Sequence, residues 1–244
     1  MTEIIKVAGV SQVFGTRTIF HDVSFSVAAG EIFVILGGSG CGKSTLLKQM
    51  IGLLAPSAGT ITVGGHDVAQ DTSAVRHEIG VMFQSGALFG SMSLQENVSL
   101  PLALFSDLPT AACNEIARIK LALVGLGAAA AQLPSEVSGG MVKRAAIARA
   151  LALDPPILML DEPSAGLDPV TSAGLDKLIL ELRDTLGTSF VVVTHELASI
   201  MAIADRCAML DATAQGLIGL GSPQELSAQP GPPMVRAFFH REVL

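Results

Sequence analysis

A glycine-rich segment that ends in lysine and serine carries the clearest chemical signal in this sequence. Residues 37–44 match the full phosphate-loop pattern G-x-x-x-x-G-K-[S/T]. Glycines let the backbone fold tightly, so that successive N–H groups point at phosphate oxygens, and a following helix adds positive partial charge. The segment predicts nucleotide binding through Gly37, Gly38, Ser39, Gly40, Cys41, Gly42, Lys43, Ser44 and Thr45.

Each polar residue of this loop has an expected role. Lys43 is expected to reach the β- and γ-phosphates, Ser44 to ligate Mg²⁺ and Thr45 to contact the α-phosphate. A glycine-rich turn without any ligand is the simpler alternative. Even the full pattern predicts only an NTPase or nucleotide binder, because kinases and GTPases of this class share it.

Two further segments have residue types suited to phosphate chemistry. The apolar run 157–160 ends in Asp161 and Glu162. We expect Asp161 to hold Mg²⁺ through water and Glu162 to polarise an attacking water, although an acid before Pro163 can also be a structural cap. Ser138, Gly139 and Gly140 open a helical pattern; such a turn is an anion site or a plain helix cap.

The elements that must position these residues follow an α/β pattern. Three uncharged runs of strand length, residues 32–36, 157–160 and 190–193, are each followed by a helical pattern, at 43–53, 171–186 and 197–204. Repetition of strand, loop and helix predicts a parallel sheet with crossover helices. Ligands bind beyond the carboxyl ends of such strands, which is where His195 follows the third run.

The remaining segments predict additions to this parallel core. Residues 4–10, 21–27 and 60–63 are typical of antiparallel or mixed-sheet strands, and the middle of the chain is mostly helical in pattern, at 94–105, 110–125 and 139–153. We expect one domain over 1–244: a core with a β region at 1–87 and 154–230, a helical subdomain at 88–153, and a tail at 231–244. The weakly amphipathic tail can dock on the body or on a partner.

Composition excludes several classes of protein. Of the 244 residues, 50% are hydrophobic and 15% charged, which excludes a disordered chain, and no stretch offers the roughly 20 apolar residues of a membrane span. The net charge of −7 argues against nucleic-acid binding. Three dispersed cysteines and the lack of a signal-peptide pattern favour a cytoplasmic location.

Taken together and in order, these segments resemble the ATP-binding subunits of ABC transporters over nearly the whole chain. The resemblance implies a P-loop NTPase fold of the ABC ATPase type that binds ATP and Mg²⁺. It identifies residues 37–45 as similar to Walker A, residues 137–141 as similar to the signature, and Asp161 and Glu162 as similar to the Walker B aspartate and catalytic glutamate.

The resemblance adds roles that the residue types alone leave open. It implies adenine stacking for Phe14, the Q-loop glutamine that contacts nucleotide and Mg²⁺ for Gln84, the D-loop for residues 164–168, and the switch histidine for His195. Taken alone, Phe14 is better explained as a core residue, Gln84 as a loop amide and His195 as a core histidine. In this family, one subunit's signature closes over ATP held by another, so Ser138, Gly139, Gly140 and Asp168 imply a homodimer.

Two details resemble the ATPases of Mla-type (Mce-associated) phospholipid transport systems of Gram-negative bacteria. These are residues 83–89, which end in Gly-Ala-Leu-Phe, and residues 135–141, which carry Met141 in place of the usual glutamine. Val137 and the D-loop depart from that pattern. This resemblance implies a permease dimer, an Mce-domain lipid-binding protein and a STAS-domain subunit as partners, at the cytoplasmic face of the inner membrane. The alternatives are the ATPase of a small-solute importer, a soluble non-transport ABC ATPase and an inactive nucleotide-binding scaffold.

Overall fold

The centre of the fold is a six-stranded sheet with the order β10-β9-β3-β8-β7-β6. The computed structural model describes residues 2–228 and 231–242. Five of the strands are parallel neighbours and β10 pairs antiparallel with β9 at one edge. The bounds are β3 Ile32–Gly37, β6 Ile79–Met82, β7 Ile157–Asp161, β8 Ser189–Val193, β9 Arg206–Asp211 and β10 Gly216–Gly221. The expected parallel α/β core is confirmed.

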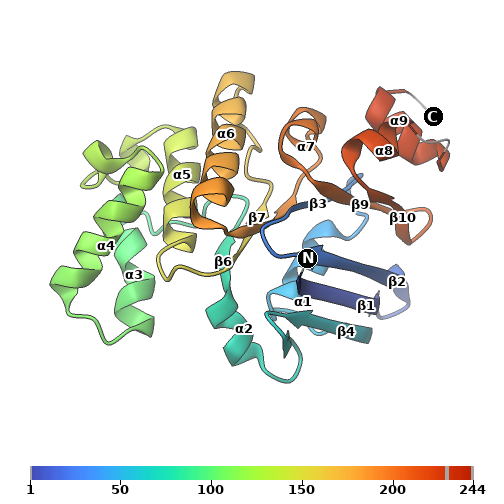
Figure 1. Cartoon of the computed structure of the whole chain (residues 1–244), viewed down its shortest axis with the longest axis horizontal. Helices are drawn as coiled ribbons and strands as arrows, with labels where there is room; N and C mark the ends of the chain where they lie inside the picture. The colour runs from blue at the N-terminus through green and yellow to red at the C-terminus, as the bar shows by residue number, and fades with distance from the viewer. Residues whose placement is uncertain (1, 229–230, 243–244) are drawn as a thin grey trace.

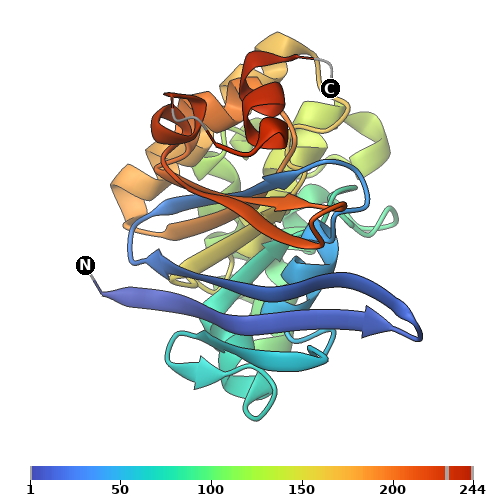
Figure 2. The same ribbon diagram turned by 90° about the vertical axis from the view of Figure 1, so that its right-hand side faces the viewer.

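A second, antiparallel sheet with the order β2-β1-β4-β5 packs under the first. Its strands are β1 Glu3–Phe14, β2 Arg17–Ala28, β4 Ala58–Val63 and β5 His66–Asp67. Figure 2 shows this sheet on one side of the six-stranded sheet and the C-terminal helices on the other. The predicted antiparallel region is therefore present, with longer strands than expected because β1 and β2 continue to the hairpin turn at Gly15.

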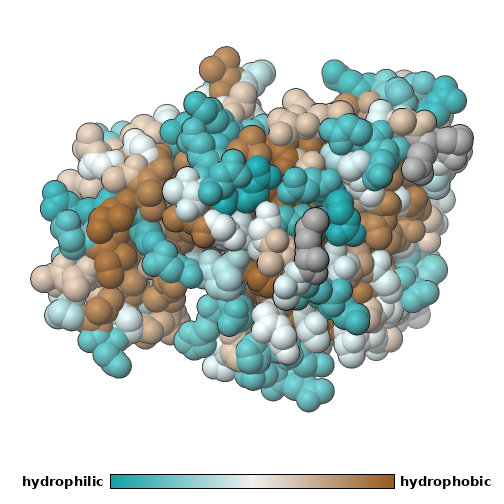
Figure 3. All heavy atoms as spheres, in the orientation of Figure 1, coloured by the Kyte–Doolittle hydropathy of each residue, from teal (hydrophilic) through white to brown (hydrophobic). Residues whose placement is uncertain are grey.

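Helices cover the other surfaces of the core. Helices α3, α4 and α5 form a helical lobe beyond β6, and hydrophobic residues gather on the lobe's surface over α3 and α4 (Figures 1 and 3). The bounds are α1 Lys43–Met50, α2 Thr72–Glu78, α3 Leu94–Phe105, α4 Thr110–Leu123, α5 Gly139–Ala150, α6 Pro169–Leu186, α7 Leu197–Ile203, α8 Pro223–Ala228 and α9 Pro233–His240. Short 3-10 turns at Gly127–Ala129 and Pro134–Glu136 join α4 to α5.

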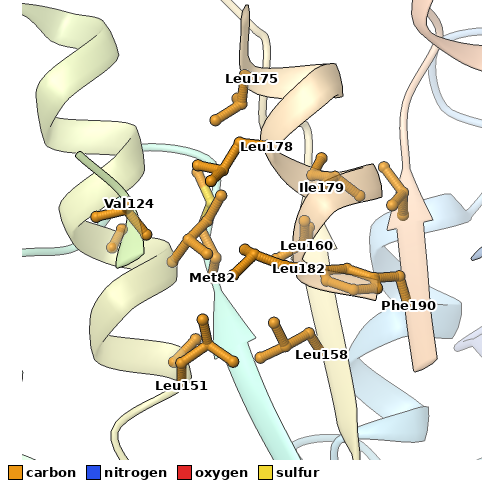
Figure 4. Close-up of a cluster of buried hydrophobic side chains, with 14 of the residues drawn as sticks. Met82, Val124, Leu151, Leu158, Leu160, Leu175, Leu178, Ile179, Leu182 and Phe190 are labelled. Carbon is orange, nitrogen blue, oxygen red and sulfur yellow. The ribbon is translucent and has the colours of Figure 1, made fainter. Parts of the chain in front are cut away.

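Alternate residues of the central strands enter two different cores. In β3, Ile32, Val34 and Leu36 pack toward α6 and the helical lobe, whereas Phe33 and Ile35 face α1 and the antiparallel sheet. A strand buried on both faces reads as a continuous apolar run, which is why its sequence could be recognised. Figure 4 shows the first of these cores, in which side chains of α6 lie over Leu158, Leu160 and Met82.

Several elements were not predicted. Strand β6 is only four residues long and contains Gly80, whose missing side chain lets the carbonyl of Ala150 approach so closely that a Cβ would lie 2.1 Å from it. Strand β9 starts and ends in charged residues, and α2 is a helix of seven residues. Short or charge-interrupted segments carry little periodic signal, so pattern reading missed them.

Helix ends also differ from expectation. Helix α1 ends at Met50 instead of residue 53, because Gly52 adopts a φ of +73° and a Cβ there would lie 2.6 Å from Thr72. Helix α5 ends at Ala150 instead of residue 153. In the predicted tail, α9 buries Val235 and Phe239 against the body, so the described part of the tail docks on its own chain, while residues 243–244 lie outside the described residues. No helix in the described part of the chain is long and apolar enough to cross a membrane.

Candidate nucleotide site

The phosphate loop lies between β3 and α1, and two of its glycines are required by its geometry. Gly37 has a φ of +147°, and a Cβ there would lie 2.2 Å from the carbonyl oxygen of Leu210. Gly42 caps α1 with a φ of +102°, and its Cβ would lie 2.6 Å from the ring of Phe20. These positions favour glycine both by conformation and by space. The loop therefore exposes the backbone at Gly38, Ser39 and Gly40 to an incoming anion.

Lys43 is the first residue of α1, and its side chain folds back over this loop. The ammonium donates hydrogen bonds to the carbonyl oxygens of Gly37, at 2.8 Å, and Gly38, at 3.1 Å. An ammonium has three donors and no acceptor, so it can bond both loop carbonyls and still donate a hydrogen bond to a phosphate. The structure places the Lys43 ammonium at the loop, and its contact with phosphate stays a prediction.

Asp161 ends β7 beside the start of α1. Burial and the negative charge of Glu162 raise the pKa of the Asp161 carboxyl, while Lys43, Lys48 and the neighbouring Ser44 hydroxyl act in the opposite direction. Its Oδ1 atom is buried without a hydrogen-bond partner among the described residues. A buried carboxylate oxygen beside a hydroxyl suits a hard cation such as Mg²⁺, which binds one or two carboxylates together with phosphates. Ser44 and Asp161 therefore fit the predicted metal site.

Glu162 and His195 meet at the ends of adjacent strands β7 and β8. The Nδ1 atom of His195 lies 2.8 Å from Oε1 of Glu162, whose Oε2 is buried and has no hydrogen-bond partner among the described residues. Glu162 is 8% exposed and has a φ of +48°, a conformation that is costly for a residue with a side chain. The His195 side chain is 60% exposed, so it is not a core histidine.

The signature turn and Asp168 are both helix caps within this chain. The Ser138 Oγ accepts a hydrogen bond from the Met141 N–H at 3.3 Å, and Asp168 accepts from Val170 and Thr171 at the start of α6. Hydrogen bonds from Thr171 lower the pKa of Asp168. Gly140 packs on Thr171, where a Cβ would lie 2.5 Å from its methyl group. Signature and D-loop are therefore held together at one surface.

The structure does not bring every predicted residue to one place in the single chain. The signature helix α5 contacts β6, and β8 and β7 separate β6 from β3, which leads into the phosphate loop. Phe14 ends β1 and is 49% exposed, so it is not a core residue; the strand that follows it packs Ile19 and Phe20 against Gly42. Gln84 is exposed just after β6, where its main-chain oxygen accepts a hydrogen bond from Lys143.

Sequence reasoning gave no role to two cations of α5. The Lys143 ammonium donates to the carbonyl oxygens of Gln84 and, at 3.3 Å, Glu162, and the Arg149 guanidinium donates to Ala87 at 2.6 Å and Gly86 at 2.8 Å. The only hint in the sequence was the presence of cations in an otherwise small and apolar helix. Both side chains tie α5 to the segment that contains Gln84.

Comparison with known proteins places these features in a family. The ABC transporter family model matches residues 20–165. The ATP-binding protein Mkl of Mycobacterium tuberculosis, named as a probable ribonucleotide transport protein, is 41% identical over 240 residues; the match covers 97% of this chain and spans 66% of that protein's length. The intermembrane phospholipid transport ATP-binding protein MlaF of Escherichia coli K12 is 40% identical over 243 residues, covering 98% of this chain and 89% of MlaF.

Solved structures agree with this placement. CbiO1 of Clostridium perfringens, part of the ABC transporter complex CbiONQ, superposes with a TM-score of 0.85 at 29% identity, covering 94% of this chain and 92% of its own. The ATP-binding cassette MJ0796, solved as a dimer in a post-hydrolysis state with ADP and Pi, gives 0.79 at 27% identity, covering 89% of this chain and 98% of its own.

Proposed function

This chain belongs to the ABC transporter family of ATP-binding proteins, and on that premise we propose that it hydrolyses ATP to power phospholipid trafficking between the inner and outer membranes. The contact between His195 and Glu162, beside Asp161 at the carboxyl end of the sheet, is the observation that carries the ATPase assignment. This contact supports an active enzyme over the alternative of an inactive nucleotide-binding scaffold, because the Glu162 carboxylate is present and the His195 ring holds it in place.

The catalytic step that we propose uses the chain's own polar groups. Lys43 and the loop amides bind the β- and γ-phosphates, and Phe14 offers an exposed ring for the adenine. The Oε2 atom of Glu162 accepts a proton from the attacking water, while His195 fixes the carboxylate through Oε1. Positioning and electrostatic stabilisation supply most of the rate in phosphoryl transfer. Ser44, Asp161 and Gln84 would hold Mg²⁺, which supplies positive charge to the phosphates.

We propose that two copies of the chain complete two nucleotide sites. The start of α5 presents Ser138 and Gly139 at the surface, whereas Gly140 is buried against Thr171, and Asp168 lies exposed nearby. Because the sheet order separates this turn from the chain's own phosphate loop, it can serve as an anion site for ATP held by a second copy. The related MJ0796 cassette was solved as a dimer with ADP and Pi, which supports a dimer here.

A groove beside the Q-loop segment is the proposed contact with the membrane permease. Its volume is about 420 Å³ and it lies between α2, α3 and β6; its lining includes Leu53, Phe83, Phe105 and Leu153. All four side chains are exposed hydrophobics, and the molecule is hollowed between α2 and the helical lobe (Figure 3). An apolar helix from a permease would bury them. We therefore propose a helical subdomain at 88–153 that receives a permease dimer, and a location at the cytoplasmic face of the inner membrane.

The proposed cargo rests on the MlaF relative, which matches across 98% of this chain. By the same likeness we propose an Mce-domain lipid-binding protein and a STAS-domain subunit as further partners. A small-solute importer is the second candidate function, favoured by the name of the equally similar mycobacterial relative.

Reconstitution separates the two cargoes. We would purify the tagged chain with its permease from detergent-solubilised membranes, place the complex in vesicles and measure ATP-dependent transfer of a fluorescent phospholipid, with the Glu162→Gln complex as control. Lipid transfer that stops in the variant supports the proposal. ATP-dependent uptake of a ribonucleotide without lipid transfer would contradict the lipid cargo and retain the ATPase. Failure to recover any permease would favour a soluble, non-transport ATPase.

A further inference from the structure

Lys143 occupies a junction of three functional segments. It lies on α5, five residues after Ser138, and its ammonium reaches the main-chain oxygens of Gln84 and Glu162. The first oxygen belongs to the segment after β6 and the second to the catalytic carboxylate's own residue. One buried side chain thus joins the signature helix, the Gln84 segment and the end of β7.

The surroundings of Lys143 show that this position is costly for a lysine. The residue is 7% exposed, and burial lowers the pKa of its ammonium, although the charges of Glu162 and Asp161 act against this shift. A buried ammonium is stable only where its donors find acceptors. The carbonyl oxygens of Gln84 and Glu162 provide these acceptors. An uncharged side chain could fill the same space, so packing alone does not explain a lysine here.

The bond to Glu162 also acts on a strained backbone. With a φ of +48°, the residue is held at its amide by a hydrogen bond of 2.8 Å to the Val193 oxygen and at its carbonyl by Lys143. Such conformations persist only where the surroundings fix them. Arg149 of the same helix donates to the main-chain oxygens of Gly86 and Ala87. Residues 84–87 are therefore bound to α5 at one end by Lys143 and at the other by Arg149.

We propose that Lys143 is a positioning residue for ATP hydrolysis, which couples the signature helix to the backbones of Gln84 and Glu162 so that the three move as one unit. The inference rests on the proposed ATPase function. Its consequence is that a movement of the helical lobe, where the permease contact is proposed, changes the position of the Glu162 carboxylate through Lys143.

The substitution Lys143→Met tests this role, because methionine fills a similar apolar volume without any donor. Lys120→Met is a matched control: Lys120 is 6% exposed, lies on the neighbouring helix α4 and pairs with Asp154, away from both carbonyls. For both variants and for Lys143→Arg, we would measure kcat and KM for ATP, the unfolding midpoint, and hydrogen exchange of the amides at residues 83–87.

Lys143→Met is expected to lower kcat by about tenfold to a hundredfold, which corresponds to the loss of charge-assisted hydrogen bonds, with less than about a threefold change in KM. Amide exchange at 83–87 should accelerate, and Lys143→Arg should restore kcat to within about threefold of wild type, since a guanidinium keeps the charge and offers N–H donors for both carbonyl oxygens. Lys120→Met should lower stability alone.

Equal kcat values for Lys143→Met and Lys120→Met would overturn the inference while leaving the ATPase assignment intact. If Lys143→Met does not fold, Lys143→Gln takes its place, because an amide keeps N–H donors without the positive charge and should give an intermediate kcat. A wild-type chain that hydrolyses no ATP at any concentration, alone or with its permease, would refute the proposed function. The exchange measurement does not depend on ATP hydrolysis, so unchanged amide exchange at residues 83–87 in Lys143→Met would refute the coupling by itself.

Discussion

The side chains of Glu162 and His195 contact each other across the ends of two adjacent parallel strands. The Nδ1 atom of His195 lies 2.8 Å from Oε1 of Glu162, so one carboxylate oxygen is occupied and Oε2 is left for another donor. The register of the two strands brings these side chains together. Asp161 pairs with Val193, and Glu162 and His195 follow within two residues of those strand ends. A carboxylate fixed on one side is suited to orient a water on its other side.

Replacing this carboxylate should separate binding from hydrolysis. We expect Glu162→Gln to bind ATP within about threefold of wild type, because glutamine keeps the shape and can still contact His195. Phosphate release should fall by about a hundredfold to ten-thousandfold, the usual contribution of a general base. Equilibrium ATP binding and single-turnover phosphate release measure the two effects. Glu181→Gln, at an exposed glutamate paired with Lys177, is the control, and wild-type turnover in Glu162→Gln would refute the base assignment.

The phosphate-loop lysine should act on binding instead. Lys43→Ala removes the ammonium that bonds the carbonyls of Gly37 and Gly38 and is placed to contact phosphates. We expect the Kd for ATP to rise by about tenfold or more, because charge-assisted hydrogen bonds are among the stronger ones. Titration with a fluorescent ATP analogue measures this, with the exposed Lys177→Ala as control. An unchanged Kd would mean that Lys43 only holds the loop.

Sequence patterns predicted the parts of this site that depend on local chemistry. The loop at 37–44 and the pair Asp161 and Glu162 follow fully buried strands, and strong periodicity made those strands visible. The bridge from Lys143 to Gln84 spans 59 positions and depends on how α5 packs on β6. Gly80 permits that packing, but a glycine within a short strand does not reveal which backbone approaches it. Long-range contacts of this kind require the tertiary structure.

Ser138 offers a way to distinguish a helix cap from a phosphate contact. Aspartate is as good an N-cap as serine, so Ser138→Asp should keep the unfolding midpoint close to that of wild type. Its negative charge at the signature turn should repel the phosphates of the second copy and reduce ATPase activity by on the order of a hundredfold. Ser138→Ala loses the cap, at a cost of about 1 kcal/mol, without adding charge.

Protein concentration provides the accompanying measurement. If the turn acts only between two copies, activity per subunit should rise steeply with concentration for wild type and stay low for Ser138→Asp. Wild-type activity in Ser138→Asp, or full activity in a proven monomer, would refute the role of the turn at the dimer interface.

A buried carboxyl on α6 leads to a prediction about stability and pH. Asp176 is 8% exposed between α6 and α7, and burial raises the pKa of its carboxyl, with the hydroxyl of Ser199 opposing and the charge of Glu196 adding to the shift. With a raised pKa, the folded state binds the Asp176 proton more tightly than the unfolded state does. The carboxyl's contribution to the free energy of unfolding is therefore complete below the ordinary aspartate pKa of about 3.9. That contribution is lost as pH rises through the raised value.

Asparagine carries no charge at any pH, so Asp176→Asn should raise the urea midpoint of unfolding at pH 7. The gain should shrink as pH falls toward about 4 and be lost below the ordinary aspartate pKa of about 3.9, where the wild-type carboxyl becomes protonated in both states. Asp107→Asn changes an exposed aspartate and should leave the midpoint unchanged across this range. A loss of stability in Asp176→Asn that is the same at pH 7 and pH 4 would show that the side chain does not act through its charge, because an effect of buried charge must shrink as the carboxyl becomes protonated.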